Sequence, residues 1–215
     1  MARRKVVLAE GEIYHIFNRG VEKRDIFLDK RDYQRFISTF VYYQYQKPPI
    51  RYSYRQRQKL PQKTPLEETG KLIEIYAYCL MPNHFHFLLK QTSKNGISKF
   101  VGQISNSYAR YFNARHDRIG SLFQGKFKAV RVTSNEQLIH LSRYIHLNPI
   151  INYLVKDLSQ YYYSSYPEYL GLKKVVCSPD EVLGQFNTKD DYEKFVLDQE
   201  EYTRELKKIE RERID

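Results

Sequence analysis

Cysteine is scarce in this sequence, and it has no long apolar run. The two cysteines, Cys79 and Cys177, stand far apart and in no motif. This spacing argues against a disulfide scaffold or a cysteine-ligated zinc, and it fits a reducing compartment. No apolar stretch reaches the length of a membrane span, and the basic start MARRKVVLAEGE has too short an apolar part for a signal peptide. We therefore expect a cytoplasmic protein.

Acidic residues are also in deficit, because 25 Asp and Glu face 36 Lys and Arg and leave a net charge of +11. A surface of that charge attracts polyanions, nucleic acid first and anionic membrane second. Tryptophan is absent, so 20 Tyr and 12 Phe carry the aromatic content. Rings mixed with basic residues suit a surface that stacks single-stranded bases and binds their phosphates. The alternative is that the rings fill the core and the charge keeps the protein soluble.

The hydrophobic pattern predicts a mixed α and β chain. Alternating residues predict strands at 12–18, 71–80, 84–90 and 126–132. Helical spacing predicts helices from an N-cap at Asp29 to about residue 45, over 96–115, and from Ser134 or Asn135 to Leu147, where Pro149 stops the last one. This order predicts an α+β, ferredoxin-like split βαβ fold. Its antiparallel sheet carries helices on one face, with one helix added after the last strand.

Three further segments fall outside that repeating pattern. Residues 47–70 carry four prolines and many basic residues, which predicts an exposed loop. Residues 150–177 are irregular and rich in tyrosine, and residues 189–213 read as a charged helix. We therefore expect one domain over residues 1–175 and a C-terminal helical extension over 176–215.

The stretch MPNHFHFLLK places two histidines, His84 and His86, in a predicted strand. Residues i and i+2 of a strand point to one face about 7 Å apart, so both imidazoles can share one metal ion at about 2.1 Å. Phe85 and Phe87 then face the core, while the histidines face the open side of the sheet. The alternative is a pair of surface histidines, because this pattern alone is weak.

The stretch RYIHLNPI places Tyr144 and Asn148 one helical turn apart. The Asn148 amide oxygen suits a third metal ligand, whereas His146 points elsewhere and His140 lies one turn before Tyr144. The alternative for Tyr144 is a tyrosine of the core.

The motifs occur in a specific order: YHIFNRG, MPNHFHFLL, YARYFNARH, GSLFQGKFKAVRV, RYIHLNPI and SSYPEYLG, from residue 14 to residue 171. In this combination the chain resembles the single-tyrosine HUH transposases, and more narrowly those associated with repetitive extragenic palindromes. The resemblance implies that Tyr144 is the nucleophile and that His84, His86 and Asn148 bind a divalent metal. It also implies cleavage and rejoining of single-stranded or hairpin DNA through a 5′-phosphotyrosine, by a monomer or a homodimer.

The ligand mix favours Mg²⁺ or Mn²⁺ as the cofactor. Basic residues on or beside the predicted strands and the second helix are candidates for DNA contacts: Arg19, Arg24, Arg110, Arg115, Arg118, Lys126, Lys128 and Arg131. Gln124 and Gly125 match a family motif. His15 lies in the family's Tyr-His pair, and we interpret it as structural because no second histidine is near it in sequence.

Other functions stay open at this point. A non-catalytic ferredoxin-like protein could bind single-stranded nucleic acid through aromatic residues on its sheet. A zinc hydrolase is a weaker alternative, because no HExxH or carboxylate-rich cluster accompanies the two histidines. A domesticated transposase that no longer mobilises its own element cannot be separated from an active one by sequence.

Overall fold

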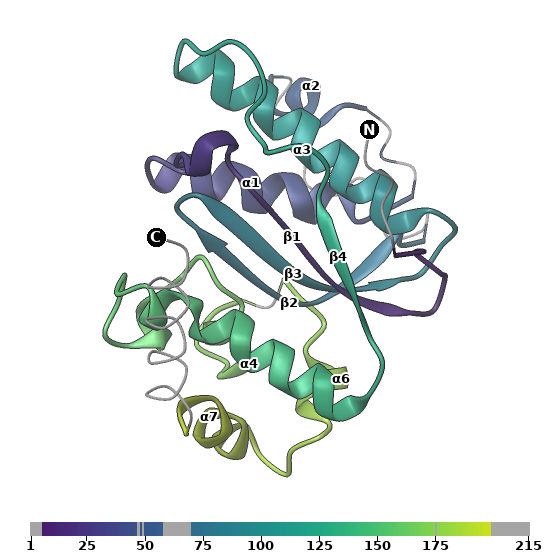
Figure 1. Ribbon diagram of the computed structural model, residues 1–215, viewed down its shortest axis with the longest axis vertical. Helices are drawn as coiled ribbons and strands as arrows, with labels where there is room; N and C mark the ends of the chain where they lie inside the picture. The colour runs from purple at the N-terminus through teal and green to yellow at the C-terminus, as the bar shows by residue number, and fades with distance from the viewer. Residues whose placement is uncertain (1–5, 47, 49, 58–69, 175, 199–215) are drawn as a thin grey trace. The chain divides into compact units, whose positions relative to one another are not determined.

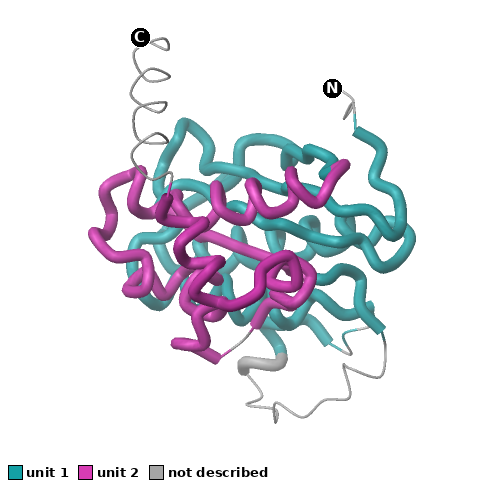
Figure 2. Tube along the Cα trace, turned by 90° about the horizontal axis from the view of Figure 1, so that it is seen from below, with its two compact units in different colours: residues 1–74, 82–132 teal, residues 75–81, 133–215 magenta. Residues whose placement is uncertain are grey.

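The computed structural model describes residues 6–46, 48, 50–57, 70–174 and 176–198. The chain divides into two compact units (Figure 2). The first unit holds residues 1–74 and 82–132, and the second holds residues 75–81 and 133–215. Strand β2 (Ile73–Met81) is thus shared between the two units.

The sheet has four strands in the order β2-β3-β1-β4, which is the ferredoxin-like order (Figure 1). Strand β1 (Ile13–Arg19) lies antiparallel to both β3 (His84–Gln91) and β4 (Lys128–Val132). Phe17 pairs with His86 on one side and with Lys128 on the other. Because directly paired residues point to the same face, this register sorts the side chains of the sheet into two sets.

Two helices cover one face of this sheet in the first unit (Figure 1). Helix α1 (Lys30–Tyr43) begins at the predicted N-cap Asp29, whose side chain accepts from the backbone N–H groups of Arg31 and Asp32. Helix α3 (Gly96–Arg115) has the predicted bounds. Rings of the two helices pack on Phe87, which has its centroid 5.2 Å from that of Phe40 and 5.9 Å from that of Phe100. The predicted inward direction of Phe85 and Phe87 is confirmed, since both are fully buried.

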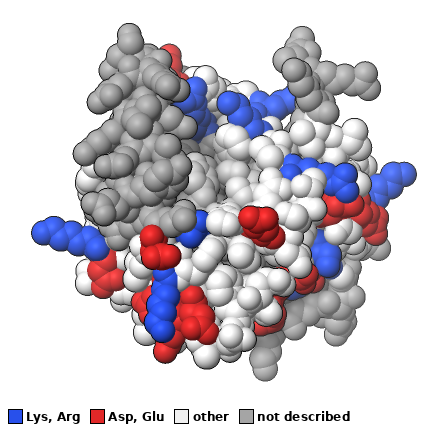
Figure 3. All heavy atoms as spheres, turned by 60° about the horizontal axis from the view of Figure 1, so that its bottom comes forward, with Lys and Arg blue, Asp and Glu red and all other residues white. Residues whose placement is uncertain are grey.

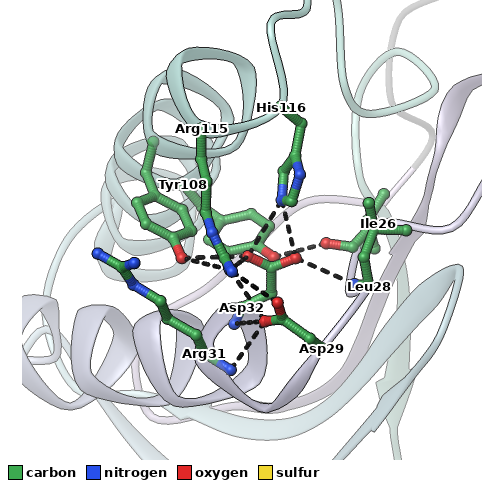
Figure 4. Close-up of polar contacts among 9 residues, drawn as sticks. Ile26, Leu28, Asp29, Arg31, Asp32, Tyr108, Arg115 and His116 are labelled. Atoms are coloured by element: carbon green, nitrogen blue, oxygen red, sulfur yellow. Dashed lines mark hydrogen bonds and ion pairs between the residues drawn. The ribbon is translucent and has the colours of Figure 1, made fainter.

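A buried carboxylate ties the end of α3 to the start of α1 (Figure 4). Asp32 is fully buried, and its oxygens accept hydrogen bonds from Leu28, Tyr111, Arg115 and His116. Arg115 also forms an ion pair with Asp29 at 2.6 Å. That hydrogen bond with Arg115 lowers the pKa of the Asp29 carboxyl to about 2, although Asp29 itself is well exposed. The charges thereby compensate one another where two helix ends meet.

The second unit contains most of β2, helix α4 (Asn135–Ile151), the tyrosine-rich segment and helices α5 (Tyr166–Tyr169), α6 (Asp180–Leu183) and α7 (Lys189–Leu197). Tyrosine hydroxyls from the irregular segment donate to β2 carbonyls at 2.7 Å, from Tyr161 to Leu80 and from Tyr169 to Tyr76. Many tyrosines are therefore core residues whose hydroxyls are hydrogen-bonded. This agrees with the alternative explanation of their number, that the rings fill the core. A short 3₁₀ helix, η3 (Leu158–Gln160), lies in the same segment.

Helix α4 does not stop before Pro149, which corrects the sequence-based prediction. The helix runs through this proline to Ile151. Pro149 removes one backbone donor, yet the side chains around it are buried: Leu147, Asn148, Ile150 and Ile151. Burial of this last turn outweighs the loss of one hydrogen bond.

The segment 47–70 is not irregular throughout, since α2 (Tyr52–Arg57) forms within it. No proline or glycine interrupts residues 50–60, and Tyr52 is buried, so a turn of helix is stabilised there. Residues 58–69 lie outside the described residues, as do residues 199–213 of the predicted C-terminal helix. Strand β4 begins at Lys128, two residues later than predicted.

These elements confirm the predicted α+β class, with the order strand, helix, strand, strand, helix, strand, helix preserved. The two compact units follow spatial packing, so the predicted division at residue 176 stays a prediction. Among the described residues, no helix is both long and apolar enough to span a bilayer.

Candidate active site

His84 and His86 lie side by side on β3, on the sheet face opposite the α1 and α3 layer. Their ring centroids are 4.9 Å apart, in an edge-to-face arrangement. His86 is buried, at 5% exposure, and His84 is half-buried. The expected open face is thus largely covered at His86, where the rings of Phe17 and His15 have centroids 5.8 and 5.1 Å away.

His15 contacts His86 directly, with its Nε2 atom 2.9 Å from Nδ1 of His86. Burial lowers the pKa of His15 to about 4, so this ring is neutral at neutral pH. One ring must then donate and the other accept. If His86 donates through Nδ1–H, its Nε2 carries the lone pair that a metal needs, which is the usual arrangement around histidine ligands.

His84 has a comparable partner in Asn83, the residue of the β2–β3 turn that precedes it. The His84 Nδ1 lies 2.5 Å from the side-chain oxygen of Asn83. A carbonyl oxygen only accepts, so Nδ1 of His84 carries the proton and Nε2 carries the lone pair. Both histidines therefore have an Nδ1 partner, and the neighbouring chain sets the ring orientations.

Tyr144 and Asn148 lie on α4 in the second unit, one turn apart as predicted. The Asn148 Nδ2 donates to the Tyr144 carbonyl at 2.7 Å. The Oδ1 of Asn148 is buried and has no hydrogen-bond partner among the described residues. A buried amide oxygen without a partner is costly, and a metal ion is one group that would satisfy it. This atom fits the role of a neutral third ligand.

His146 and His140 take structural roles on the same helix. The ring of His146 is fully buried between the Tyr192 hydroxyl and the Ser165 hydroxyl, each 2.7 Å from one of its nitrogens. Burial lowers the pKa of His146 to about 3, so it stays neutral. His140 contacts the Arg143 guanidinium at 2.7 Å. Both rings therefore have partners outside the proposed metal site.

All eight predicted DNA-contacting residues lie in the first unit, and several already contact other side chains. Arg19 donates to Gln124, Arg24 pairs with Glu22 at 2.9 Å, and Arg131 pairs with Glu12 at 2.5 Å.

Arg118 donates to Asn113 and to the Ser121 carbonyl, and Arg115 is held by the two aspartates of α1. Lys128 lies 5.9 Å from the Phe17 ring centre, while Lys126 and Arg110 are exposed. Their contacts with DNA stay predictions.

Gln124 and Gly125 lie shortly before β4 in the sequence, and Gln124 is hydrogen-bonded to the end of β1. The Gln124 N–H donates to the Arg19 carbonyl at 2.8 Å. Gly125 has φ +63°, which favours glycine, but no atom lies within 4 Å of the position a Cβ would take. Backbone conformation, and not close approach, therefore explains this glycine.

No group of three or more His, Cys, Asp or Glu side chains in the described part of the chain is arranged to hold a metal ion. The predicted ligand set is not of this type, because its third ligand, Asn148, is an amide. Sequence reasoning missed two partners, His15 and Asn83. Asn83 directly precedes His84 and could have been noticed, whereas His15 needs the strand register to be known.

Comparison with known protein families gives a match. Residues 54–148 match the family described as Transposase IS200 like. The matched segment contains both histidines and Tyr144, and it ends at Asn148. The match bears out the family resemblance drawn from the motifs.

Two solved structures resemble the chain. One is a REP-associated tyrosine transposase bound to a REP hairpin, with 15% identity, a TM-score of 0.55, and coverage of 85% of this chain and 93% of that one. At this identity the likeness shows a shared fold. A Saccharomyces cerevisiae tRNA(His) guanylyltransferase has 9% identity and a TM-score of 0.39 over 89% of this chain and 78% of that one, too low to carry an argument. No curated protein sequence shows significant similarity to the chain.

Proposed function

We propose that this protein is a transposase that cleaves and rejoins single-stranded or hairpin DNA through a covalent bond between Tyr144 and a 5′-phosphate. One observation carries the proposal: a single family match spans the histidine pair, Tyr144 and Asn148. The solved transposase of the same fold is bound to a hairpin, which favours hairpin DNA as the partner here as well.

The proposed metal site consists of His84, His86 and Asn148, with Mg²⁺ or Mn²⁺ as the ion. The Nδ1 partners of both histidines and the partnerless Oδ1 of Asn148 support this ligand set. Two neutral imidazoles and one amide add no negative charge that would repel a phosphate. A bound divalent cation would polarise the scissile phosphate and offset the charge that develops on it.

Tyr144 supplies the nucleophile in this proposal. Its phenol oxygen forms a bond to phosphorus, and the bond between phosphorus and the 3′-oxygen breaks. The 3′-oxygen leaves as a hydroxyl, and the phenol proton is lost. The reverse step, with the same or another 3′-hydroxyl, breaks the tyrosine–phosphorus bond and joins DNA without an external energy source.

The test is formation of an adduct that survives SDS. Wild-type protein is incubated with labelled DNA that carries a hairpin and a single-stranded flank, with Mn²⁺ or Mg²⁺. We expect an adduct from wild type and none from Tyr144→Phe. Tyr153→Phe is the matched control, because Tyr153 follows the same helix and is exposed.

Two results would contradict the proposal. An equal adduct from Tyr144→Phe would assign the nucleophile to another tyrosine. If no adduct forms with many DNA sequences, although DNA is bound, the protein is a non-catalytic nucleic-acid-binding module.

A further inference from the structure

A continuous chain of hydrogen bonds runs through the core of the second unit and holds α4. It starts at the backbone of β2, passes through one side of α4 and reaches a tyrosine of α7. Its members, in order, are the Tyr78 backbone N–H, Ser165, His146, Tyr192 and Ser142, and all five residues are fully buried. The four links measure 2.9, 2.7, 2.7 and 3.1 Å in that order. The chain therefore joins α4 to both β2 and α7.

The protons of this chain have one consistent direction. Ser142 donates to a carbonyl of its own helix at 2.8 Å, so it accepts from the Tyr192 hydroxyl. Tyr192 then accepts from Nδ1–H of His146, whose ring is kept neutral by burial, and Nε2 accepts from Ser165. Another acceptor for the Ser165 proton, the Tyr78 carbonyl at 3.2 Å, is farther away than Nε2. Every hydroxyl and ring nitrogen of the chain is thereby paired.

The chain consists of neutral groups that water does not reach. Charged side chains of both signs are spread over the face of the molecule in Figure 3, where salt screens them. Hydrogen bonds between buried neutral groups are not screened in this way, and a buried donor or acceptor that loses its partner is destabilising. The chain therefore opposes any rotation of α4 that would break one of its links.

The residues proposed for catalysis lie on the other side of α4. Ser142 and His146 are four residues apart and share one side of the helix, and Tyr144 and Asn148 share another in the same way. Two residues correspond to about 200° around a helix, so the two pairs face in nearly opposite directions. Because Tyr192 contacts both Ser142 and His146, it restrains α4 against rotation about its own axis.

A small rotation of α4 would displace the groups on its other side. A helix with its side chains has a radius of about 5–6 Å, so a rotation of about 10° moves an atom at this radius by about 1 Å. A phenol oxygen lies at least that far from the axis and moves at least as much. A displacement of about 1 Å can slow a reaction about 100-fold. The orientation of Tyr144 therefore depends on how firmly the opposite side of the helix is held.

We infer that His146 and Tyr192 are positioning residues, which fix the rotation of α4 and so orient the nucleophile and the amide ligand on its other side. The inference rests on the proposed function, which assigns these roles to Tyr144 and Asn148. Neither His146 nor Tyr192 belongs to the proposed ligand set or attacks DNA. Loss of a link should therefore slow formation of the covalent bond without weakening DNA binding.

The test compares Tyr192→Phe with Tyr169→Phe. Tyr169 is the matched control because it is equally buried and its hydroxyl donates to the Tyr76 carbonyl of β2 at 2.7 Å, outside the chain. The rate of adduct formation is measured at saturating hairpin DNA, and DNA affinity is measured by fluorescence anisotropy. We expect Tyr192→Phe to slow adduct formation at least about 10-fold with unchanged affinity, and Tyr169→Phe to stay within about 2-fold of the wild-type rate.

Ser142→Ala is a second variant, which removes the acceptor on α4 and leaves the phenol of Tyr192 in place. It should slow adduct formation in the same way, whether or not Tyr192→Phe folds. Equal slowing by Tyr192→Phe and Tyr169→Phe would assign the effect to general loss of stability and overturn the inference. An unchanged rate in both Tyr192→Phe and Ser142→Ala would also overturn it, as would slowing that is matched by an equal loss of DNA affinity.

Failure of the proposed function is separately visible by hydrogen exchange, which needs neither DNA nor a metal ion. The amides of residues 138–148 should exchange faster in Tyr192→Phe than in Tyr169→Phe if the chain holds α4. Equal exchange in the two variants would overturn the inference. A difference in exchange without any adduct from wild type would remove the catalytic proposal and leave the restraint on α4 standing.

Discussion

The Nε2 atom of His15 lies 2.9 Å from the Nδ1 atom of His86, so a residue of β1 fixes the ring of a proposed metal ligand on β3. The two histidines are 71 positions apart in the sequence. It also predicts a role for His15 that does not depend on contact with DNA.

Replacement of His15 by Phe should weaken Mn²⁺ binding about 10-fold, because the ring of His86 loses the partner that orients it. The phenylalanine ring retains packing against Phe17. His15→Gln, whose amide can accept the same hydrogen bond, should recover part of the affinity. Isothermal titration calorimetry with Mn²⁺ measures all three proteins, and equal affinities would show that His15 only fills space.

Asn148→Leu should lower Mn²⁺ affinity about 10-fold or more, because one of three proposed ligands is lost. The same change should alter the free energy of unfolding by no more than about 1 kcal/mol. It removes the Nδ2 bond to Tyr144 but also a buried oxygen that lacks a partner. Urea denaturation measures the second quantity. Lower stability with unchanged Mn²⁺ binding would assign Asn148 a purely structural role.

Asp32→Ala should destabilise the protein by about 3 kcal/mol, because several buried donors and the Arg115 guanidinium lose their acceptor. Asp29→Ala is the matched comparison at the same helix end. Its side chain is exposed and caps α1, so the expected cost is about 1 kcal/mol. Chemical denaturation gives both values, and a larger loss at Asp29 would contradict this ranking.

Stability should fall as pH is lowered from about 6.5 towards 3. Burial lowers the pKa of His146 from its usual 6.5 to about 3, so across this window the unfolded chain binds a proton that the folded chain does not. The contribution is fully present above pH 6.5, and its loss approaches about 1.4 kcal/mol per pH unit within the window. His15 acts in the same direction, since burial lowers its pKa to about 4.

The measurement is urea denaturation at several pH values for wild type and His146→Phe. The variant should be less stable at pH 7, because Tyr192 and Ser165 lose their partner, and it should show a shallower pH dependence. An unchanged slope would mean that other groups govern acid stability.

Local pattern predicted much of this fold. Alternation placed Phe85 and Phe87 in the core, and the N-cap of Asp29 fixed the start of α1. Prediction failed where burial outweighed local preference, at Pro149 within α4 and at the short helix α2. At Pro149 buried side chains stabilise a turn that contains the proline, and at α2 a proline-free stretch with buried Tyr52 forms a helix between the prolines of the segment.

The candidate site was predictable only in part, because some of its residues are close in the sequence and others are far apart. His84 with His86, and Tyr144 with Asn148, each follow from the period of one strand or one helix. The contact between His15 and His86 depends on how β1 and β3 are paired.

Strand β2 has a consequence for any attempt to dissect the chain. The path passes between the two compact units at residues 74/75, 81/82 and 132/133. A C-terminal fragment that begins after Val132 would lack residues 75–81, whose carbonyls accept from Tyr161 and Tyr169. The second unit, which carries Tyr144, therefore cannot be isolated by truncation. Only a fragment with an added copy of that strand, or a circularly permuted chain, would contain every residue of the second unit without the first.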